Sequence, residues 1–260
     1  MLTSIVEEGR IARVTFTAFD HLTLPHEERN HLIEFLGEVR DYEHLIIDIR
    51  HVGGGWFFDQ VELLIRPNIT EMIEYYSFGF FTDGQLASYA AEFQRQYILQ
   101  IGNIGAHFAV GGPTGYAIYP ARELVERYNL IYMNEGDLER LAYGYKLSTL
   151  VVPWLDSDLA FNGHIWVLVS AFNFSAAEIF ARLSKEAGFT LVGHTTGGAI
   201  GGAGLTQFRM PNSGIIIRFD TLYITDSLGR AKEEFPTEPH HFAMPGRCAL
   251  QTTLALIEEL

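Results

Sequence analysis

Two short runs of apolar residues constrain the fold of this chain most strongly. LIIDIR (45–50) and HIWVLVS (164–170) are almost continuously apolar, and strands with this pattern are typically buried on both faces of a sheet. The first run is followed by three glycines at 53–55. The second is followed by SAAEIFARLSKEAG (175–188), which is typical of a helix that ends at a glycine. The alternation of strands with helices predicts an α/β fold.

Further segments continue this alternation. Residues 11–19 alternate in polarity and include β-branched side chains, which predicts a strand. An acidic start at 27–28 and apolar side chains at helical spacing through Val39 predict a helix after it. FTLVGH (189–194) is typical of another strand, and 214–226 of two extended pieces. Strand, helix and strand in this order predict a βαβ unit with a buried sheet.

The segment at about 56–160 has a weaker pattern. Apolar residues at helical spacing predict an amphipathic helix over 86–97. Pro120 is expected to open another helix at the first helical position. GGPTGYAIYP (111–120) is typical of a loop or a hairpin. Because no repeat, low-complexity linker or clear boundary is present, we expect a single domain over 1–260, with an insertion or lid at about 56–160.

The charge of the chain excludes one large class of partner. With 18 lysines and arginines against 32 aspartates and glutamates, the formal net charge is −14. No clustered cationic surface is available for a phosphate backbone, so we expect no nucleic-acid partner. No stretch approaches the roughly 20 apolar residues that a membrane span needs. The first residues lack the pattern of a signal peptide, which leaves the compartment open.

Metal and cofactor sites also lack their usual residues. Cys248 is the only cysteine, which excludes a disulfide framework and a cysteine-based metal site. His240 and His241 are adjacent and have no partner ligand at helical spacing, so zinc is not expected. The glycine cluster at 197–204 lacks the Gly-Lys-Ser/Thr of a phosphate loop. We therefore expect neither a metal nor a cofactor.

Ser175 lies where the strand at 164–170 has just ended and a helix begins. Ser175 and Glu178 form the Ser-x-x-Glu pattern of a capping box, in which the serine satisfies backbone donors of the first turn. The same position suits a nucleophile, because a hydroxyl there is exposed and nearby N–H groups favour a developing oxyanion. The surrounding residues are not Gly-x-Ser-x-Gly, so an α/β-hydrolase elbow is not indicated. The residues alone leave both alternatives open.

Two other stretches are equally open to more than one interpretation. The glycines at 53–55 form either a simple turn or a backbone that presents an N–H group to a ligand. They follow the carboxyl end of a strand, where α/β sites gather. Glu233 and Glu234 lie in the polar segment GRAKEEFPTEP, which by itself is typical of a solvated charge run.

Three segments together resemble peptidase family S41, the C-terminal-processing and tricorn-core group. LIIDIRHVGGG resembles that family's Asp-Leu-Arg-x-Asn-x-Gly-Gly stretch. FNFSAAEIFARLSKEAGFTLVGHTTGG resembles its Ser-Ala-x-Glu nucleophile helix, the next strand and the Gly-x-x-Thr-x-Gly loop. MPNSGIIIRFDTLYITDSLGRAKEEFPTEPH resembles the terminal block. The resemblance covers about residues 10–55 and 160–242, in the family's order.

The resemblance implies a fold like that of the crotonase and ClpP enzymes, with a long mixed insertion between the glycine motif and the nucleophile helix. Ser175 matches the nucleophile, and the backbone N–H groups of Gly54 and Ala176 match the donors of the oxyanion hole. One branch of the family has a catalytic lysine 25 residues after the serine. That position is Ile200 here and no lysine is near it, so this branch is excluded. A PDZ module, frequent in relatives, is not expected.

The tricorn-like branch uses a Ser-His-Ser-Glu tetrad instead. Its glutamate matches Glu233, which follows Ser175 by 58 residues (233 − 175), with Glu234 as the alternative. The histidine of that branch comes from a segment ahead of this domain. The chain is therefore expected to be a fragment of a longer enzyme, an inactive relative, or an enzyme in which His51 supplies the base. Val52 stands where the family's glycine motif has an asparagine. At this position the chain departs from the family pattern, so the geometry of the loop is expected to differ.

The function implied by the resemblance is that of a serine peptidase, which hydrolyses peptide bonds by acyl transfer in a peptide or protein substrate. The alternative is a non-catalytic module that binds peptides or apolar ligands. A crotonase-type acyl-CoA enzyme would need a basic site for the nucleotide phosphates, which the composition disfavours. The sequence leaves substrate preference, oligomerisation and compartment open.

Overall fold

The computed structural model describes most of the chain, which divides into two compact units. The described residues are 1–19, 24–83, 108–110, 118–155, 157–198, 206–219, 222–232 and 234–260. The first unit contains Met1–Ile73, Val151–Ala199 and Pro236–Leu260, and the second contains Glu74–Leu150 and Ile200–Phe235.

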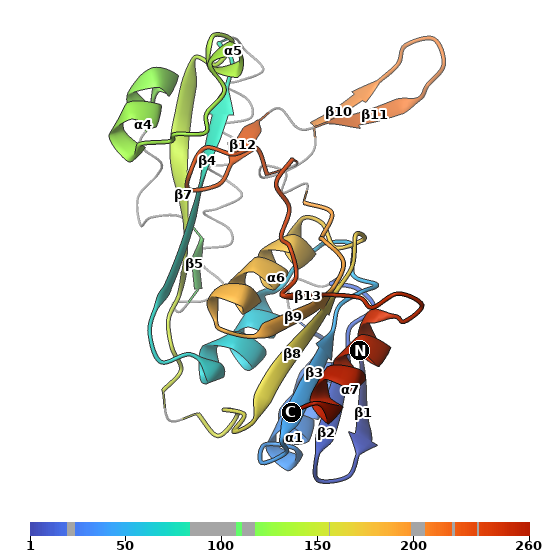
Figure 1. Ribbon diagram of the computed structural model, residues 1–260. Coiled ribbons are helices and arrows are strands. Elements are labelled where there is room, and N and C mark those ends of the chain that lie inside the picture. The colour runs from blue at the N-terminus through green and yellow to red at the C-terminus, as the bar shows by residue number, and fades with distance from the viewer. Residues whose placement is uncertain are drawn as a thin grey trace. The chain divides into compact units, whose positions relative to one another are not determined.

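The first unit is built on a six-stranded sheet in the order β1-β2-β3-β8-β9-β13 (Figure 1). Its strands are β1 (Leu2–Glu7), β2 (Ile11–Thr15), β3 (His44–Asp48), β8 (His164–Val169), β9 (Thr190–Gly193) and β13 (His241–Phe242). β1 pairs antiparallel with β2, and the other neighbouring strands are parallel. Parallel strands need crossover connections, and these place helices on the faces of the sheet.

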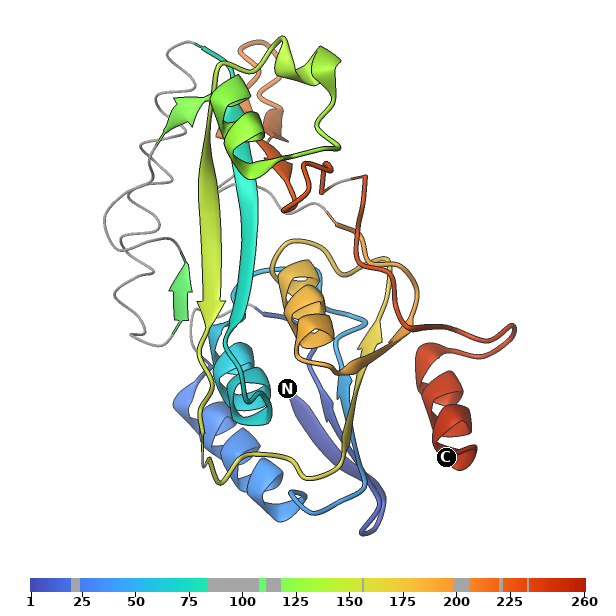
Figure 2. The same ribbon diagram turned by 60° about the vertical axis from the view of Figure 1, so that its left-hand side comes forward.

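Helices cover both faces of this sheet. They are α1 (His26–Glu38), α2 (Phe58–Gln60), α6 (Ala176–Glu186) and α7 (Ala249–Glu258), and α2 continues as a π-helix over Val61–Ile65 and a 3-10 turn over Arg66–Asn68. Figure 2 shows α6 and α7 on opposite sides of the sheet. Ile46, Trp166 and Leu168 pack on the side of α7, against Ala249 and Ile257. Successive side chains of a strand point to opposite faces of the sheet. The residues that alternate with Ile46, Trp166 and Leu168 in β3 and β8 therefore face the side of α6.

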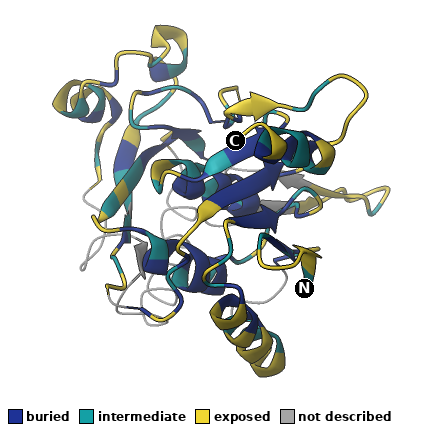
Figure 3. Cartoon of the chain, turned by 60° about the horizontal axis from the view of Figure 1, so that its bottom comes forward, coloured by how far each residue is buried: buried dark blue, intermediate teal, exposed yellow. Residues whose placement is uncertain are grey.

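The central strands are therefore buried on both faces, as Figure 3 shows by their dark blue colour. All five residues of β3 and all but the first of β8 are buried. This burial explains why both strands appear in the sequence as continuous apolar runs. It also fixes the carboxyl ends of β3 and β8. The glycine bend (residues 53–55) follows the first of these strands, and the turn before α6 follows the second.

The second unit has an apolar core of its own. Its strands are β4 (Ile73–Phe81), β5 (Phe108–Val110), β6 (Tyr119–Pro120), β7 (Tyr143–Val151), β10 (Thr206–Arg209), β11 (Ile216–Phe219) and β12 (Tyr223–Thr225), with helices α4 (Ala121–Tyr128) and α5 (Glu135–Leu138). One sheet has the order β12-β4-β7-β5, with β6 paired to β7, and β10 pairs with β11 in a hairpin. Phe78 and Phe80 of β4 pack with Ala121 and Leu124 of α4 and with Leu138 of α5.

Most of the predicted elements are confirmed, with shifted ends. The strand expected over 11–19 ends at Thr15 as β2, and the helix after it is α1. The apolar runs at 45–50 and 164–170 are β3 and β8, and the helix expected over 175–188 is α6, which begins at Ala176. The prediction that strands alternate with helices in an α/β fold is thus correct for the first unit.

Several expectations need correction or lie outside the described residues. Pro120 is the N-cap of α4 and not its first helical residue, because its ψ of 136° is extended and it still pairs in β6. The sequence patterns did not predict β1, β4 or β7, although the aromatic run IEYYSFGFF of β4 has high β-propensity. The helix expected over 86–97 lies outside the described residues, as does most of 111–120.

The longest helix among the described segments is α1, with 13 residues. No helix in those segments combines the length and the apolar character that crossing a membrane requires.

Candidate active site

Ser175 adopts a backbone conformation that residues other than glycine rarely take. Its φ is +55° and its ψ is −122°, and Asn129 is the only other described non-glycine residue with a positive φ. Such a conformation costs about 1–3 kcal/mol and persists only where the surroundings enforce it. Here the Ser175 N–H donates to the Gly198 carbonyl (3.1 Å), and the Ser175 carbonyl accepts from the Ile179 N–H (3.0 Å).

The Ser175 hydroxyl does not cap the helix. Ser175 is the N-cap residue of α6, but its side chain makes no capping hydrogen bond. The carboxylate of Glu178, the other half of the expected box, is fully buried and turned to other partners. The capping-box alternative is therefore wrong. The half-buried hydroxyl has no structural hydrogen bond to any residue that the structure describes.

The glycine bend lies directly against this serine. A methyl group added to Gly54 would lie 3.1 Å from Ser175 Cβ and 3.6 Å from Ser175 Oγ. The Gly53 carbonyl accepts a hydrogen bond from the Phe174 N–H (3.1 Å), which ties the two loops together. Neither the Gly54 N–H nor the Ala176 N–H donates to a described residue, and Ala176 is the first residue of α6, where the helix offers no acceptor. The structure thus brings three of the four expected site residues together.

The fourth expected residue, Glu233, lies outside the described residues. Its alternative, Glu234, is exposed, and so is His51. His240 Nδ1 accepts a hydrogen bond from the Leu191 N–H (2.9 Å), and burial lowers the pKa of this histidine. In the part of the chain that the structure describes, no three histidine, cysteine, aspartate or glutamate side chains gather as metal ligands would.

Asn173 joins the turn before Ser175 to the glycine bend, and sequence analysis missed it. Its side chain is fully buried. The Nδ2 group donates to the carbonyls of Ile49 (2.6 Å) and Val52 (2.9 Å), while Oδ1 accepts from the Ser170 N–H (2.6 Å). An asparagine within the otherwise apolar stretch AFNF was the only available signal. A side chain that satisfies two carbonyls of one loop and an N–H of the other keeps both loops in one arrangement.

We expect Asn173→Ala to lower the free energy of unfolding by about 2 kcal/mol, because two carbonyls and one N–H each lose a hydrogen bond in a buried place. Urea unfolding followed by circular dichroism measures this change. Asn162→Ala is the matched control, since the Asn162 side chain is exposed and, among the described residues, its hydrogen bond is to Asp41 (2.6 Å). Equal destabilisation by the two substitutions would show that Asn173 does not join the loops.

An ion pair with a buried carboxylate supports the same bend. Asp48, the last residue of β3, is buried and accepts two hydrogen bonds from Arg50, at 2.8 Å from Nε and 2.7 Å from the terminal nitrogen. The hydrogen bond with Asp48 raises the pKa of the Arg50 guanidinium. The Arg50 carbonyl accepts from Ser170 Oγ (2.7 Å). The strand end, the bend and the turn before the serine therefore form one connected structure.

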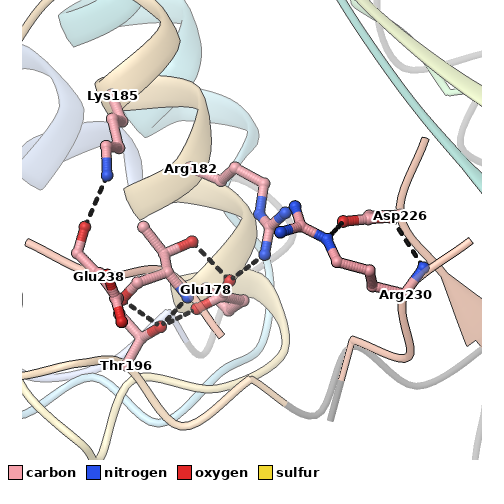
Figure 4. A network of polar contacts seen from close by, with 8 residues as sticks. Glu178, Arg182, Lys185, Thr196, Asp226, Arg230 and Glu238 are labelled. Atoms are coloured by element: carbon pink, nitrogen blue, oxygen red, sulfur yellow. Dashed lines mark hydrogen bonds and ion pairs between the residues drawn. The ribbon is translucent and has the colours of Figure 1, made fainter. Parts of the chain in front are cut away.

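Glu178 is the centre of a second buried network, drawn in Figure 4. One carboxylate oxygen accepts from the Thr237 hydroxyl (2.7 Å) and from the Arg182 guanidinium (3.1 Å), and the other accepts from the Thr196 hydroxyl. Thr196 and Thr237 are themselves paired, since the Thr196 N–H donates to the Thr237 carbonyl (3.0 Å). Thr196 lies two residues before Gly198, whose carbonyl holds the Ser175 N–H. The network therefore connects α6 to the loop that supports the serine.

The family of the chain follows from a direct comparison. The sequence profile of peptidase family S41 matches residues 10–241. The chain belongs to peptidase family S41. S41 is a family of hydrolases. The match confirms the resemblance that the sequence analysis found in three segments, which are the glycine motif, the nucleophile helix and the terminal block. No curated protein sequence matches this S41 chain.

Solved structures show the S41 fold at low sequence identity. A candidate peptidase from Parabacteroides merdae is 15% identical, with a TM-score of 0.55 over 98% of this chain and 63% of that one. Mature CPAF complexed with lactacystin is 18% identical, with a TM-score of 0.54 over 89% of this chain and 47% of that one. This S41 chain therefore spans less than two thirds of either structure's length. At such identities the likeness is evidence for the mixed α/β fold alone.

Proposed function

We propose that this chain carries the nucleophile of a serine peptidase and that Ser175 is that nucleophile. In the proposed reaction, Ser175 Oγ bonds to the carbonyl carbon of a peptide bond while its proton passes to a general base. The backbone N–H groups of Gly54 and Ala176 stabilise the negative charge on the carbonyl oxygen. The C–N bond then breaks as the leaving amine takes a proton, and water hydrolyses the acyl-enzyme.

The conformation of Ser175 is the observation that carries this proposal. A positive φ at a residue other than glycine has a cost, and strain of this kind is concentrated at functional sites. The side chain held in this way stands against Gly54 and beside the first N–H group of α6. Membership in peptidase family S41 supports the same assignment, and it supports peptides or proteins as the substrates.

The base and the wider architecture are also part of the proposal. A serine hydroxyl without a base is a poor nucleophile. We infer that a histidine acts as the base and that Glu233 orients it, directly or through a second serine. The parallel arrangement of β2, β3, β8, β9 and β13 supports a fold of the crotonase and ClpP type. Within that fold, the segment at about 56–160 is proposed as an insertion that lines the substrate cleft or closes over it.

The test of this function is covalent labelling of the full-length protein with a fluorophosphonate, which forms an Oγ–P bond as fluoride leaves. Labelling is expected at Ser175, and Ser175→Ala should slow it by at least about 100-fold, because the attacking oxygen is lost. Ser213→Ala is the control, since Ser213 is an exposed serine of the β10–β11 hairpin and should have no effect. Labelling is read by gel fluorescence and by peptide mapping.

A chain that never reacts with the fluorophosphonate, or that reacts equally after Ser175→Ala, contradicts the peptidase proposal. The alternative from the sequence, a non-catalytic module that binds peptides or apolar ligands, would then be the better account of the fold.

A further inference from the structure

Two exposed aromatic side chains stand beside Ser175, and the proposed reaction does not use them. Phe172 is 55% exposed and Phe174 is 39% exposed. Their ring centroids are 5.5 Å apart in an edge-to-face arrangement. Single exposed apolar residues are ordinary on protein surfaces. Two aromatic rings in mutual contact, one of them adjacent in sequence to the strained serine, form a small apolar surface that needs an explanation.

These rings are held against the glycine bend. A methyl group added to Gly53 would lie 3.0 Å from Phe174 Cζ and 3.3 Å from two ring atoms of Phe172. A side chain at position 53 would require both rings to shift by a few tenths of an ångström. The Phe174 N–H also donates to the Gly53 carbonyl (3.1 Å). The turn that carries both rings therefore lies directly against the glycine bend, beside Gly54 and Ser175.

The turn that carries the rings is itself held in place. Asn173, which lies between them in sequence, is fully buried and fixes the turn to the carbonyls of Ile49 and Val52. The chain thus buries the polar residue of this turn and exposes the two apolar ones, the reverse of the usual distribution. Exposed aromatic rings on a rigid turn can bury an apolar group of a ligand at little entropic cost.

We propose that Phe172 and Phe174 form a subsite for an apolar side chain next to the scissile bond, so that the chain prefers substrates with leucine, methionine or phenylalanine there over charged residues. The inference rests on the proposed function in one respect, which is that the scissile carbonyl is placed at Ser175. The two rings lie beside Gly53, next to the place between Gly54 and Ser175 where the substrate carbonyl would bind. The substrate side chain that flanks this carbonyl would therefore lie against the rings, and an apolar side chain suits them.

One experiment compares the labelling rates of two probes that differ only in their side chain. Diphenyl phosphonate analogues of N-acetylleucine and N-acetylaspartate each form an Oγ–P bond with a reactive serine as phenol leaves. The leucine analogue is expected to react at least about 10-fold faster. Phe172→Ala and Phe174→Ala should each reduce this ratio several-fold, whatever the absolute rates. Phe242→Ala is the matched control, because Phe242 is 57% exposed on β13 and should leave the ratio unchanged.

A second experiment detects binding without reaction. In the Ser175→Ala chain with ¹³C-labelled phenylalanine, N-acetylleucine amide is expected to shift the ring signals of Phe172 and Phe174, assigned through the two alanine variants. N-acetylaspartate amide should leave them in place. Ring shifts in a protein that no fluorophosphonate labels would support the subsite and contradict the peptidase. A fluorophosphonate-reactive Ser175 with equal phosphonate rates and no selective shift overturns the subsite and leaves the peptidase standing.

Discussion

Replacing Gly55 by alanine is expected to destabilise the first unit more than other single methyl additions in the glycine bend. Gly55 has a φ of +118°, and an added Cβ would lie 2.0 Å from the Phe19 carbonyl oxygen. That oxygen also accepts a hydrogen bond from the Trp56 N–H (2.7 Å), and this bond would have to break if the Phe19 carbonyl moved away from the added methyl group. Backbone strain and overpacking together are expected to cost about 3–5 kcal/mol. The midpoint of thermal unfolding should fall by roughly 10 °C.

The consequence extends beyond the bend, because Phe19 is a core residue. Its ring packs edge-to-face on Phe16 at 5.7 Å and on Phe180 of α6 at 5.9 Å. Gly37→Ala is the matched control: Gly37 is exposed inside α1, and an added methyl group there meets nothing within 4 Å. That substitution should be neutral or stabilise by up to about 1 kcal/mol. A Gly55→Ala chain as stable as Gly37→Ala would mean that the bend does not have this conformation.

Replacing Glu178 by alanine should cost about 3 kcal/mol, because the mostly buried side chain of Arg182 loses its ion pair with this carboxylate. The hydroxyls of Thr196 and Thr237 lose their shared acceptor in the same step. The change is measured by denaturant unfolding. Glu178→Gln keeps the shape of the side chain but removes its charge, so its effect should be intermediate. Fluorophosphonate labelling of Ser175 is also expected to slow in both variants, since Thr196 belongs to the loop that supports the serine.

Glu186→Ala provides the comparison within the same helix. Glu186 is exposed in the last turn of α6, and removing its side chain should change stability by no more than about 0.5 kcal/mol. If Glu178→Ala and Glu186→Ala destabilise the protein equally, the carboxylate of Glu178 is not the buried centre of a network. The serine would then lack this support from the loop at 196–198.

The sequence predicts the central strands of the first unit well, because burial on both faces requires apolar residues at nearly every position of a strand. β3 and β8 can be recognised as continuous apolar runs, and the start of α6 by the turn before Ser175. The second unit was much harder to predict. β4 and β7 are paired within that unit by long-range contacts, and their aromatic residues do not alternate in a way that separates strand from helix.

The positions of Ser175, Gly54 and Ala176 beside one another agree with the expectation from the family motifs, while their chemical roles remain the proposal made above. Glu233 remains a prediction of the motif spacing. Asn173 could not be found from the sequence, because its importance comes from two carbonyls more than 120 residues away along the chain. A single asparagine in a turn carries no sign of such partners.

What the sequence by itself determined is the two buried strands β3 and β8, the helix that follows the serine and membership in peptidase family S41. The tertiary structure alone decided what the Ser-x-x-Glu pattern does, since that local pattern is the same for a cap and for a nucleophile. The carboxylate of Glu178 bonds to threonines 18 and 59 residues later and not to the Ser175 N–H, and the Ser175 hydroxyl makes no capping hydrogen bond. Partners so distant meet only when the sheet has assembled, so no local pattern could reveal the choice.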